Sequence, residues 1–310
     1  MGKEQWSVCW RCPHRVRPLI SGMATIAYLG TGLLGSGFVE AALGRGDRVT
    51  VWNRSREKAE ALAAFGAQVA HTPADAVRGA ERVHLVLKDD AVVDEVFGAL
   101  RPGLEAGAVV IDHSTTQPAL TAARAERLAA DGIAYLHAPV FIGPAAARKG
   151  QGSIYVSGPA DAYARVEHAL ASQAETVRYL GERPDLAAAY KLMGNAFLIG
   201  LGGLIADVLT IGAGCEVPAT DALQLLDAFN PANVVRNRGL KMSQGDFSAS
   251  FELVMARKDI RLMMEAAGAR PLAMLPSLAA RMDEVIAQGH GADDFGVIAR
   301  DALAERDRGH

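Results

Sequence analysis

Aromatic residues make up only 6% of this chain, and long blocks of one charge are missing as well. The 310 residues carry a formal net charge of −3, with no basic block interleaved with aromatic side chains. Binding of nucleic acids or of an anionic membrane surface usually depends on such a block, so we expect neither partner. Small molecules are the expected partners.

Cysteine is also rare, since the chain has three. Three cysteines cannot close a disulfide framework, and Cys215 lies alone in an apolar stretch. This usage is typical of a reducing compartment. We therefore expect a cytoplasmic protein.

Residues 1–22 fit the remaining chain poorly. They contain two tryptophans and a basic cluster, and they lead without a linker into the first predicted strand at Met23. They have no continuous apolar segment of the kind a secretory signal needs. Cys9, Cys12 and His14 hint at metal binding, but no second ligand cluster follows, so we expect no metal. We predict a disordered extension or a start codon placed too early.

What the chain does contain is a strand, a glycine turn and a helix near its start. The apolar segment 24–29 runs into Gly30-x-Gly32-x-x-Gly35, and helix-patterned residues follow at 38–43. The first glycine allows a tight turn, the second admits a pyrophosphate, and the third lets the helix pack on the strand. The helix N-terminus then attracts the anion. We predict a dinucleotide site formed by Gly30, Thr31, Gly32, Leu33, Leu34 and Gly35.

The end of the second predicted strand, at residues 48–52, indicates which dinucleotide binds. Asn53-Arg54-Ser55 follows it. An acidic residue here would bond the ribose 2′-hydroxyl of NAD, whereas a neutral residue followed by arginine accommodates a 2′-phosphate. We therefore predict NADP (NADPH) as the cofactor, contacted by Asn53, Arg54 and Ser55.

Strand and helix patterns alternate as far as residue 181, and only helical spacing follows. The predicted fold is α/β, with a Rossmann-type doubly wound parallel sheet at 23–185, a long interdomain helix, and an all-α domain for substrate binding and oligomerisation at 186–310. Further strands are expected at 68–70, 82–87, 109–112, 133–136, 153–156 and 176–179, and helices at 57–65, 161–171, 186–214, 219–228, 234–242, 251–267 and 272–288.

Polar loops follow the predicted strands at their carboxyl ends. In a doubly wound sheet this edge binds the ligand. Lys88 and Asp89 come directly after the strand that ends at Leu87, and we expect all three to contact the cofactor. An aspartate at this place also suits the cap of the next helix, which leaves its role open.

Residues 192–214 are long and apolar enough to raise the question of a membrane span. Asn195 and Asp207 interrupt the stretch and leave 11 residues between them, fewer than the ~20 that a bilayer requires. We expect no span. A helix buried between domains or subunits explains the stretch better, with its glycines allowing close backbone approach. This burial predicts a homodimer or homotetramer.

Lys191 and Asn195 lie four residues apart on this predicted helix and therefore share a face. A lysine at the edge of an apolar segment is partly desolvated, which lowers its pKa and prepares it to exchange a proton near neutrality. A lysine that merely snorkels and an asparagine that only packs would give the same pattern. The neighbouring motifs are needed to choose between a catalytic pair and a pair that only packs.

Taken together, the motifs resemble the β-hydroxyacid dehydrogenase family, which includes 3-hydroxyisobutyrate dehydrogenases and the glyoxylate and succinic semialdehyde reductases and has an NAD(P)-binding fold of the 6-phosphogluconate dehydrogenase type. The resemblance runs from Met23 nearly to the end of the chain. It rests on the glycine turn, Asn53-Arg54-Ser55, Asp112-x-Ser114-Thr115-x-x-Pro118, Ala138-Pro139-Val140, Lys191-x-x-x-Asn195, Phe251 and Lys258-Asp259.

The resemblance implies an oxidoreductase that passes hydride between the nicotinamide and a small carbonyl or hydroxy-acid substrate, without a metal. Lys191 would act as general acid in reduction and as general base in oxidation, because hydride addition builds an alkoxide that needs a proton. Asn195 would orient the substrate. The remaining matches imply substrate contacts for Ser114, Thr115, Phe251 and Asp259, and cofactor contacts for Thr115 and Lys258.

The loop after Val140 departs from the family. Many members have Ser-Gly-Gly there and bind a substrate carboxylate with it, whereas this chain has Phe141-Ile142-Gly143. The apolar loop favours a bulkier or less charged carbonyl compound, or an imine. Imine reductases resemble this family but typically lack the lysine found here as Lys191, which favours carbonyl reduction. An imine reductase and a catalytically silent NADPH-binding module remain as alternatives.

Overall fold

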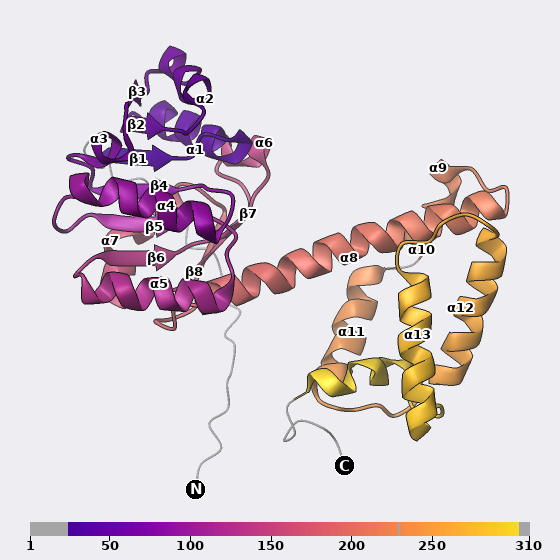
Figure 1. Cartoon of the computed structure of the whole chain (residues 1–310). Helices are drawn as coiled ribbons and strands as arrows, with labels where there is room; N and C mark the ends of the chain where they lie inside the picture. The colour runs from indigo at the N-terminus through magenta and orange to yellow at the C-terminus, as the bar shows by residue number, and fades with distance from the viewer. Residues whose placement is uncertain (1–23, 229, 304–310) are drawn as a thin grey trace, which may run out of the picture. The chain divides into compact units, whose positions relative to one another are not determined.

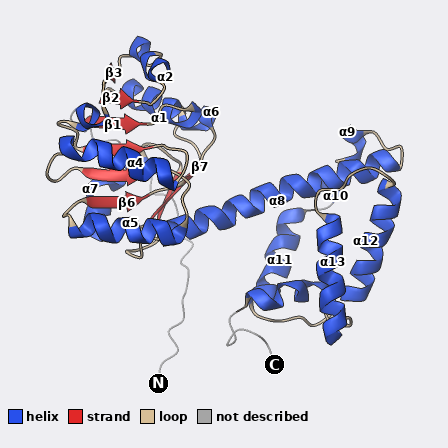
Figure 2. Cartoon of the chain, in the orientation of Figure 1, coloured by secondary structure: helices blue, strands red, loops and turns tan. Residues whose placement is uncertain are grey.

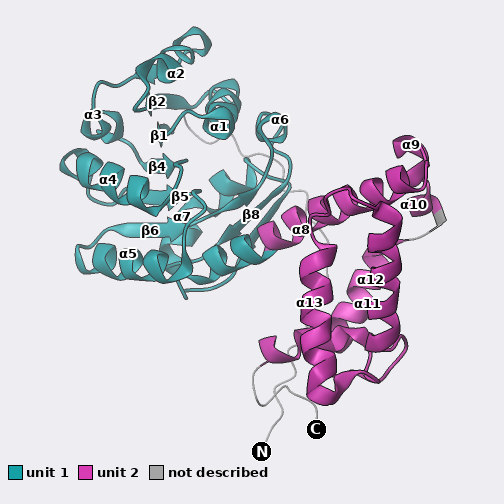
Figure 3. Ribbon diagram, turned by 45° about the vertical axis from the view of Figure 1, so that its right-hand side comes forward, with its two compact units in different colours: residues 1–193 teal, residues 194–310 magenta. Residues whose placement is uncertain are grey.

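The computed structural model describes residues 24–228 and 230–303 of the chain. The chain divides into two compact units, Met1–Met193 and Gly194–His310, which are described separately below (Figure 3). The division falls inside helix α8 (Leu186–Gly214). The extension predicted at residues 1–22 lies outside the described residues.

The first unit is built on a parallel six-stranded sheet with helices on its faces (Figures 1 and 2). The strand order is β3-β2-β1-β4-β5-β6, so the chain winds outward in both directions from the pair β1 and β4. This is the topological switch point at which doubly wound sheets bind their ligands. The predicted fold class is confirmed. The strands are β1 (Thr25–Leu29), β2 (Arg48–Trp52), β3 (Gln68–Val69), β4 (Arg82–Leu85), β5 (Val109–Asp112) and β6 (Ala134–His137).

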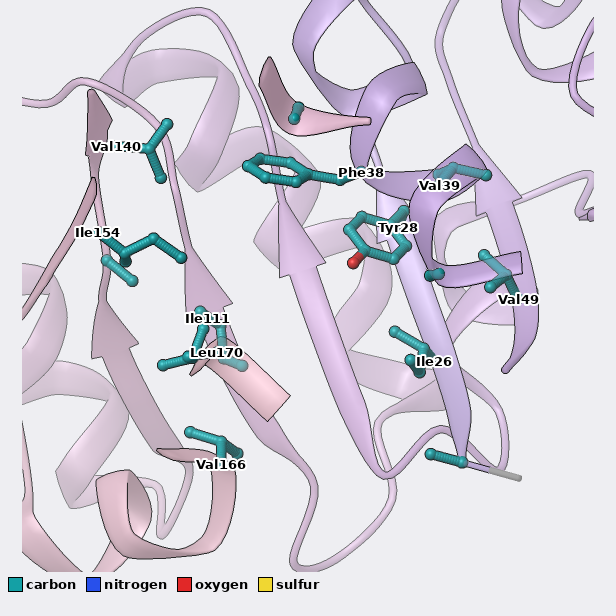
Figure 4. Packing of buried hydrophobic residues seen from close by; sticks show 14 of the residues in the cluster. Ile26, Tyr28, Phe38, Val39, Val49, Ile111, Val140, Ile154, Val166 and Leu170 are labelled. Carbon is teal, nitrogen blue, oxygen red and sulfur yellow. The ribbon is translucent and has the colours of Figure 1, made fainter. Parts of the chain in front are cut away.

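The two faces of this sheet carry separate cores because successive side chains of a strand point to opposite faces. On one face Ile26 and Tyr28 of β1 pack with Phe38, and Figure 4 shows this cluster. On the other face Ala27 and Leu29 of the same strand belong to a second cluster. A strand covered on both faces explains the continuous apolar run at the start of the described chain.

From residue 24 onward, seven α-helices of the first unit precede α8. The predicted helix 57–65 is wrong as one element, because α2 ends at Glu60 and a 3-10 turn at Ala63–Phe65 follows. The chain tightens there so that Ala59 and Leu62 both reach the core. The helices are α1 (Leu33–Gly44), α2 (Arg56–Glu60), α3 (Pro73–Val77), α4 (Asp90–Leu100), α5 (Pro118–Ala130), α6 (Pro144–Ala147) and α7 (Ala160–Ala171), and Arg101–Gly103 is a second 3-10 turn.

A small sheet of β7 (Val140–Phe141), β8 (Ser153–Val156) and β9 (Thr176–Tyr179) completes the first unit. Strand β7 runs antiparallel to β8, and β8 runs parallel to β9. The short strand β7 was not predicted. Gly152 permits it, since a Cβ at that position would lie 2.7 Å from the backbone oxygen of Phe141.

The second unit is helical. Its helices are the rest of α8 with α9 (Ala219–Ala222), α10 (Leu225–Ala228), α11 (Pro231–Ser243), α12 (Leu253–Ala267) and α13 (Leu275–Val285), followed by a π-helical turn (Ile286–His290) and a 3-10 helix (Phe295–Ala302). Helices α12 and α13 share the buried core of this unit.

The four helices predicted after residue 214 all have different bounds. Helix α11 is longer than the predicted 234–242, and α12 begins at Leu253 and not at 251. The segment 219–228 divides at Leu223 and Gln224, where the backbone bonds step over three residues instead of four. Helix α13 begins at Leu275 and not at 272, because the Asp207 carboxylate accepts the N–H groups of Ala273, Met274 and Leu275. A side chain distant in sequence therefore sets the start of α13.

The length argument against a membrane span is wrong for helix α8, which is long and apolar enough to cross a membrane by length and composition, and most of whose apolar surface is exposed within the chain. The expectation of no span stays a prediction. The second half of α8 nevertheless packs inside the helical unit. Asp207 binds the start of α13, and a Cβ on Gly214 would lie 1.9 Å from the Ala266 oxygen of α12. This half of the helix therefore has protein neighbours.

Candidate active site

The glycine turn between β1 and α1 has the geometry of an anion site. Gly30 adopts a φ of +100°, and a Cβ there would lie 2.2 Å from the Val86 oxygen. A Cβ on Gly35 would lie 2.0 Å from the Gly30 oxygen, so both positions require glycine. At Gly32, in contrast, no described atom lies within 4 Å of a Cβ. The first and third glycines thus close the turn, and the second leaves space for a ligand.

Asn53 joins this turn to the loop after β2. Its Oδ1 accepts the Thr31 N–H at 3.0 Å, and its Nδ2 donates to the Ser55 oxygen at 2.8 Å. The Asn53 amide therefore binds the backbone of the glycine turn and that of its own loop. It brings no negative charge to the end of β2. A 2′-phosphate would meet no repulsion from this side chain.

A cleft of about 430 Å³ lies between the glycine turn and the ends of β2 and β4. Most of the residues predicted for the cofactor line it, namely Gly30, Gly32, Leu33, Leu34, Gly35, Asn53, Arg54, Ser55, Leu87 and Lys88. The sequence reasoning missed Trp52, Lys58, Val86, Val92, Glu95 and Val96.

Lys58 is the most informative of the missed residues, since it lies four positions after Arg54 and lines the same cleft. Its place was available in the sequence, because Lys58 belongs to the helix that directly follows the Asn53-Arg54-Ser55 loop. Thr31 and Asp89 were predicted to contact the cofactor but do not line the cleft. Thr31 is buried, and Asp89 caps α4 by accepting the Val92 N–H at 3.1 Å, the role that the sequence had left open.

Lys191 lies in the first unit, on the opening turns of α8. Its Nζ donates to the Val140 oxygen at 2.8 Å and lies 4.2 Å from the centre of the Phe141 ring. Partial burial lowers the pKa of Lys191, because desolvation disfavours the ammonium form. The helix start is fixed by Ser157, whose Oγ accepts the Ala187 N–H and donates to the Pro184 oxygen.

Phe141 is the centre of an aromatic group beside this lysine. Its ring meets the edge of Tyr155 at 5.6 Å, and Tyr155 stacks on Tyr190 at 5.8 Å. Ile142 and Gly143 continue the loop toward α6, which packs so closely on α1 that a Cβ on Gly37 would lie 2.9 Å from the Pro144 oxygen. The surface next to the ammonium is therefore apolar and held in place.

Ser114 and Thr115 follow β5 at the same edge of the sheet. Ser114 is 2% exposed, its Oγ accepts the Leu87 N–H at 3.0 Å, and its own N–H binds Asp112. This serine ties the ends of β4 and β5 together. Thr115 is exposed. Their predicted contacts with substrate and cofactor remain predictions.

The other predicted site residues belong to the second unit. Asn195 follows Lys191 by one turn of α8. Phe251 packs edge to face on Phe295 at 5.7 Å, and Lys258 pairs with its neighbour Asp259 at 2.8 Å. The roles predicted for these four residues stay predictions.

Comparison with known proteins places this geometry in a family. Residues 25–181 match the family described as the NAD binding domain of 6-phosphogluconate dehydrogenase. The chain is 30% identical over 246 residues to the uncharacterized oxidoreductase YfjR of Bacillus subtilis, covering 78% of this chain and 86% of the relative. It is 27% identical over 283 residues to the 3-sulfolactaldehyde reductase of Escherichia coli, covering 89% and 95%.

The cytokine-like nuclear factor N-PAC of Xenopus tropicalis is 30% identical over 244 residues, but this chain spans only 45% of its length. Among solved structures, the imine reductase from Myxococcus stipitatus in complex with NADP+ shares the fold, with a TM-score of 0.81, 22% identity, and coverage of 89% of this chain and 99% of that chain. The chain belongs to the β-hydroxyacid dehydrogenase family of NAD(P)-dependent oxidoreductases, whose nucleotide-binding domain is of the 6-phosphogluconate dehydrogenase type.

Proposed function

We propose that this protein is an NADP(H)-dependent reductase that transfers hydride between NADPH and a small aldehyde or ketone, or the corresponding dehydrogenase in reverse, with Lys191 as general acid and base. The observation that carries the proposal is the placement of the Lys191 ammonium, bonded to the Val140 carbonyl beyond the end of β6, with a pKa lowered by burial.

The residues of the cleft fit a dinucleotide with a 2′-phosphate. The open space at Gly32 and the N-terminus of α1 suit a pyrophosphate. Arg54 and Lys58 line the cleft beside the neutral Asn53, and two cations without a carboxylate at the strand end favour NADP over NAD. When bound, NADPH supplies the hydride for the reduction.

Lys191 supplies the proton. One N–H of the ammonium is used by the Val140 carbonyl, which leaves two for the substrate. As negative charge develops on the substrate oxygen, these donors stabilise it and one of them protonates it. In the oxidative direction the neutral amine takes the proton back. Burial lowers the pKa of Lys191, so less free energy is needed to form the neutral amine than for an ordinary lysine.

Phe141 and Ile142 suggest the class of substrate. An apolar wall beside the lysine provides no donor for a carboxylate, and the aromatic group holds that wall in place. We therefore favour an aldehyde or ketone without a carboxylate over a 3-hydroxy acid. The related 3-sulfolactaldehyde reductase supports an aldehyde as the reacting group.

The proposal includes a homodimer or homotetramer in a reducing cytoplasm. Exposed apolar side chains on one helix are unusual for a monomer and suggest a subunit interface. The exposed apolar residues of α8 include Leu192, Met193, Phe197, Leu198, Ile199, Leu201, Leu204 and Ile205, which are 37 to 74% exposed. Analytical ultracentrifugation would give a monomer mass if this part of the proposal is wrong.

An imine reductase is the second candidate, favoured by the apolar loop and by the fold shared with the Myxococcus stipitatus enzyme. The test is NADPH oxidation against semialdehydes, α-keto acids, apolar aldehydes and cyclic imines. We expect apolar aldehydes to react fastest, and faster rates with cyclic imines would favour the second candidate. Binding of NADPH without turnover of any compound would indicate the silent module.

Cofactor choice has a separate test. Fluorescence titration should give a lower dissociation constant for NADPH than for NADH, because Arg54 and Lys58 line the cleft and would attract a 2′-phosphate. Arg54→Asp should weaken NADPH by roughly tenfold to a hundredfold and leave NADH nearly unchanged. Equal affinities in the wild type would contradict the NADP assignment.

A further inference from the structure

Two histidines are buried between the sheet and α1, next to the proposed active site. His84 of β4 is fully buried, and His113, directly after β5, is 3% exposed. Their ring planes are nearly parallel, at 10° to one another, with centroids 5.2 Å apart. His84 Nδ1 lies 2.9 Å from His113 Nε2, and His113 Nδ1 lies 2.7 Å from the Ala138 oxygen. The proposed function uses neither side chain.

The protons of this pair can be assigned from their partners. The Ala138 carbonyl can only accept, so His113 Nδ1 carries a hydrogen and donates it. Burial lowers the pKa of His113 to about 4, so the ring is neutral and its Nε2 is an acceptor. His84 Nδ1 must therefore carry a hydrogen and donate it to His113. The pair selects a single tautomer of His113.

The pair is not a proton relay. His84 Nε2 is buried and has no hydrogen-bond partner among the described residues. Tyr28 covers the ring of His84 by stacking at 4.5 Å, which does not present its hydroxyl to that nitrogen. A proton relay needs a further donor or acceptor at its end, and His84 Nε2 has none among the described residues. We therefore interpret the histidine pair as a structural support for the backbone that it binds.

The segment held by the histidine pair is the turn 138–140, which carries the acceptor of Lys191. After His137 the chain leaves the large sheet, and the Ala138 N–H still binds the Asp112 oxygen while Tyr155 N–H binds the Pro139 oxygen. The Ala138 carbonyl receives its hydrogen bond from His113. Two residues later the Val140 carbonyl accepts Lys191 Nζ at 2.8 Å. The bond from His113 therefore holds the beginning of the segment 138–140, whose last residue carries the acceptor of Lys191 and pairs with β8.

We propose that His113 is a positioning residue of this enzyme, which fixes the Ala138-Pro139-Val140 turn in neutral form and thereby holds the Lys191 ammonium at its place. The inference rests on the proposed role of Lys191 as proton donor. His84 contributes by holding His113 in the tautomer that donates to Ala138.

Two variants separate the two hydrogen bonds of His113. The amide of an asparagine reaches the position of Nδ1, so His113→Asn keeps the donor to Ala138 and loses the acceptor for His84. The longer His113→Gln reaches the position of Nε2, so it keeps the bond to His84 and loses the one to Ala138. Both variants are polar and similar in size, and both leave one buried group unpaired.

We expect His113→Gln to lower kcat by roughly tenfold to a hundredfold, because a displaced catalytic group is costly. Its alkaline limb of activity should move to lower pH, since the ammonium loses its carbonyl acceptor. His113→Asn should keep the kcat and pH profile of the wild type within about threefold. Leu170→Ala, which removes a buried side chain of the same core, should lower the melting temperature without moving the pH profile.

A readout independent of turnover is the rate at which acetic anhydride acetylates Lys191, followed by peptide mass spectrometry across pH. In His113→Gln the lysine should react roughly tenfold faster at neutral pH, because more of it is the free amine. In His113→Asn the rate should match the wild type. Equal rates and equal pH profiles in all three proteins would overturn the role of His113, as would a change in His113→Asn as large as that in His113→Gln.

Lys191→Ala distinguishes failure of this inference from failure of the proposed function. If Lys191→Ala keeps full turnover, the proposed function itself is wrong. If Lys191→Ala is inactive while His113→Gln behaves like the wild type in both readouts, only the positioning role is wrong.

Discussion

The described part of the first unit buries three histidines beside one aspartate, Asp112, whereas the described part of the second unit buries two aspartates and no histidine. In the first unit, buried histidines donate to backbone carbonyls that lie just outside the strands. His113 donates to the Ala138 oxygen, and His137 donates to the Ser114 oxygen. In the second unit, buried carboxylates accept hydrogen bonds from backbone N–H groups. Asp207 does so at the start of α13. Asp294 accepts the N–H groups of Ser250, Phe251 and Gly296.

The difference matters for the proposed site, which lies beside the histidines. A neutral imidazole orients a carbonyl without adding charge, whereas a buried carboxylate near Lys191 would favour the ammonium and raise its pKa. Such a carboxylate would oppose the lowering that burial produces. In the helical unit the buried carboxylates of Asp207 and Asp294 bind N–H groups of the backbone. The comparison thus indicates that a neutral histidine, and not a carboxylate, holds the Ala138 carbonyl close to the acceptor of Lys191.

The largest difference between the units should appear in kcat when one lysine of each unit is replaced in separate variants. Lys191→Ala should lower kcat by roughly a thousandfold, because the proton donor is lost, while NADPH binding changes little. The matched change Lys258→Ala should lower kcat less than tenfold and act mainly on the KM for NADPH, if the predicted cofactor contact exists. Steady-state kinetics and NADPH titration would measure both. A loss of kcat in Lys258→Ala as large as that in Lys191→Ala would break the comparison.

The second effect is the acid sensitivity of the two units. His113 has a folded pKa of about 4 against 6.5 for an ordinary histidine, so the unfolded state binds the proton first as pH falls. Its contribution to stability is complete above pH 6.5 and is lost between pH 6.5 and about 4, a loss of about 3 kcal/mol. Burial lowers the pKa of His84 and His137 in the same direction.

In the second unit the sign is reversed. Hydrogen bonds from backbone groups and Ser250 hold the pKa of Asp294 at about 2, below the usual 3.8, so its contribution is present above pH 3.8 and is lost only below it. We expect the first unit to unfold first in acid. Trp52 fluorescence in a Trp6→Phe, Trp10→Phe variant reports the first unit, and far-ultraviolet circular dichroism reports the remaining helices. Loss of the helical unit first would contradict this order.

A third effect tests whether the buried carboxylates support the fold. Asp207→Asn should destabilise the second unit by roughly 2 kcal/mol, because the amide has one acceptor oxygen for three N–H groups. Asp283→Asn, which breaks an exposed pair with Arg257, is the matched control and should cost less than about 1 kcal/mol. Urea unfolding followed by circular dichroism measures both, and equal costs would remove the distinction.

The smallest effect concerns the apolar wall of the first unit. Phe141→Ser should lower the KM for an aldehyde that carries a carboxylate by roughly tenfold relative to an apolar aldehyde, because a hydroxyl donor replaces the ring. Tyr155→Phe keeps the ring that packs on Phe141 and should leave this preference unchanged. The opposite shift in Phe141→Ser would show that the wall does not select against carboxylates.

Local rules were enough to predict the large sheet and the glycine turn. The turn has three glycines at fixed spacing, and strands β1 and β5 are apolar runs, so both can be read without knowledge of distant residues. The bounds were less certain, since β4 ends at Leu85 and not at 87. Strand β7 could not be predicted, because its two residues form a strand only through pairing with β8. The start of α13 likewise depends on Asp207, a residue distant in sequence.

The residues of the candidate active site could be predicted where a local pattern marks them, and not where they depend on distant contacts. Arg54 was found by its place at a strand end, and Lys58 could have been found because it lies in the helix that directly follows this loop. The contact of Lys191 with Val140 and the pairing of His84 with His113 arise from strand register and from the approach of segments far apart in the chain. A single sequence contains the residues for these contacts but not their distances.

The most direct test of the central claim is the pH dependence of NADPH oxidation by the wild type and by Lys191→Ala with one reactive aldehyde. If Lys191 donates the proton, the wild-type rate falls as pH rises through a pKa below that of an ordinary lysine, and the residual rate of the variant lacks this limb. If the variant keeps the wild-type rate, or shows the same alkaline limb, Lys191 is not the proton donor.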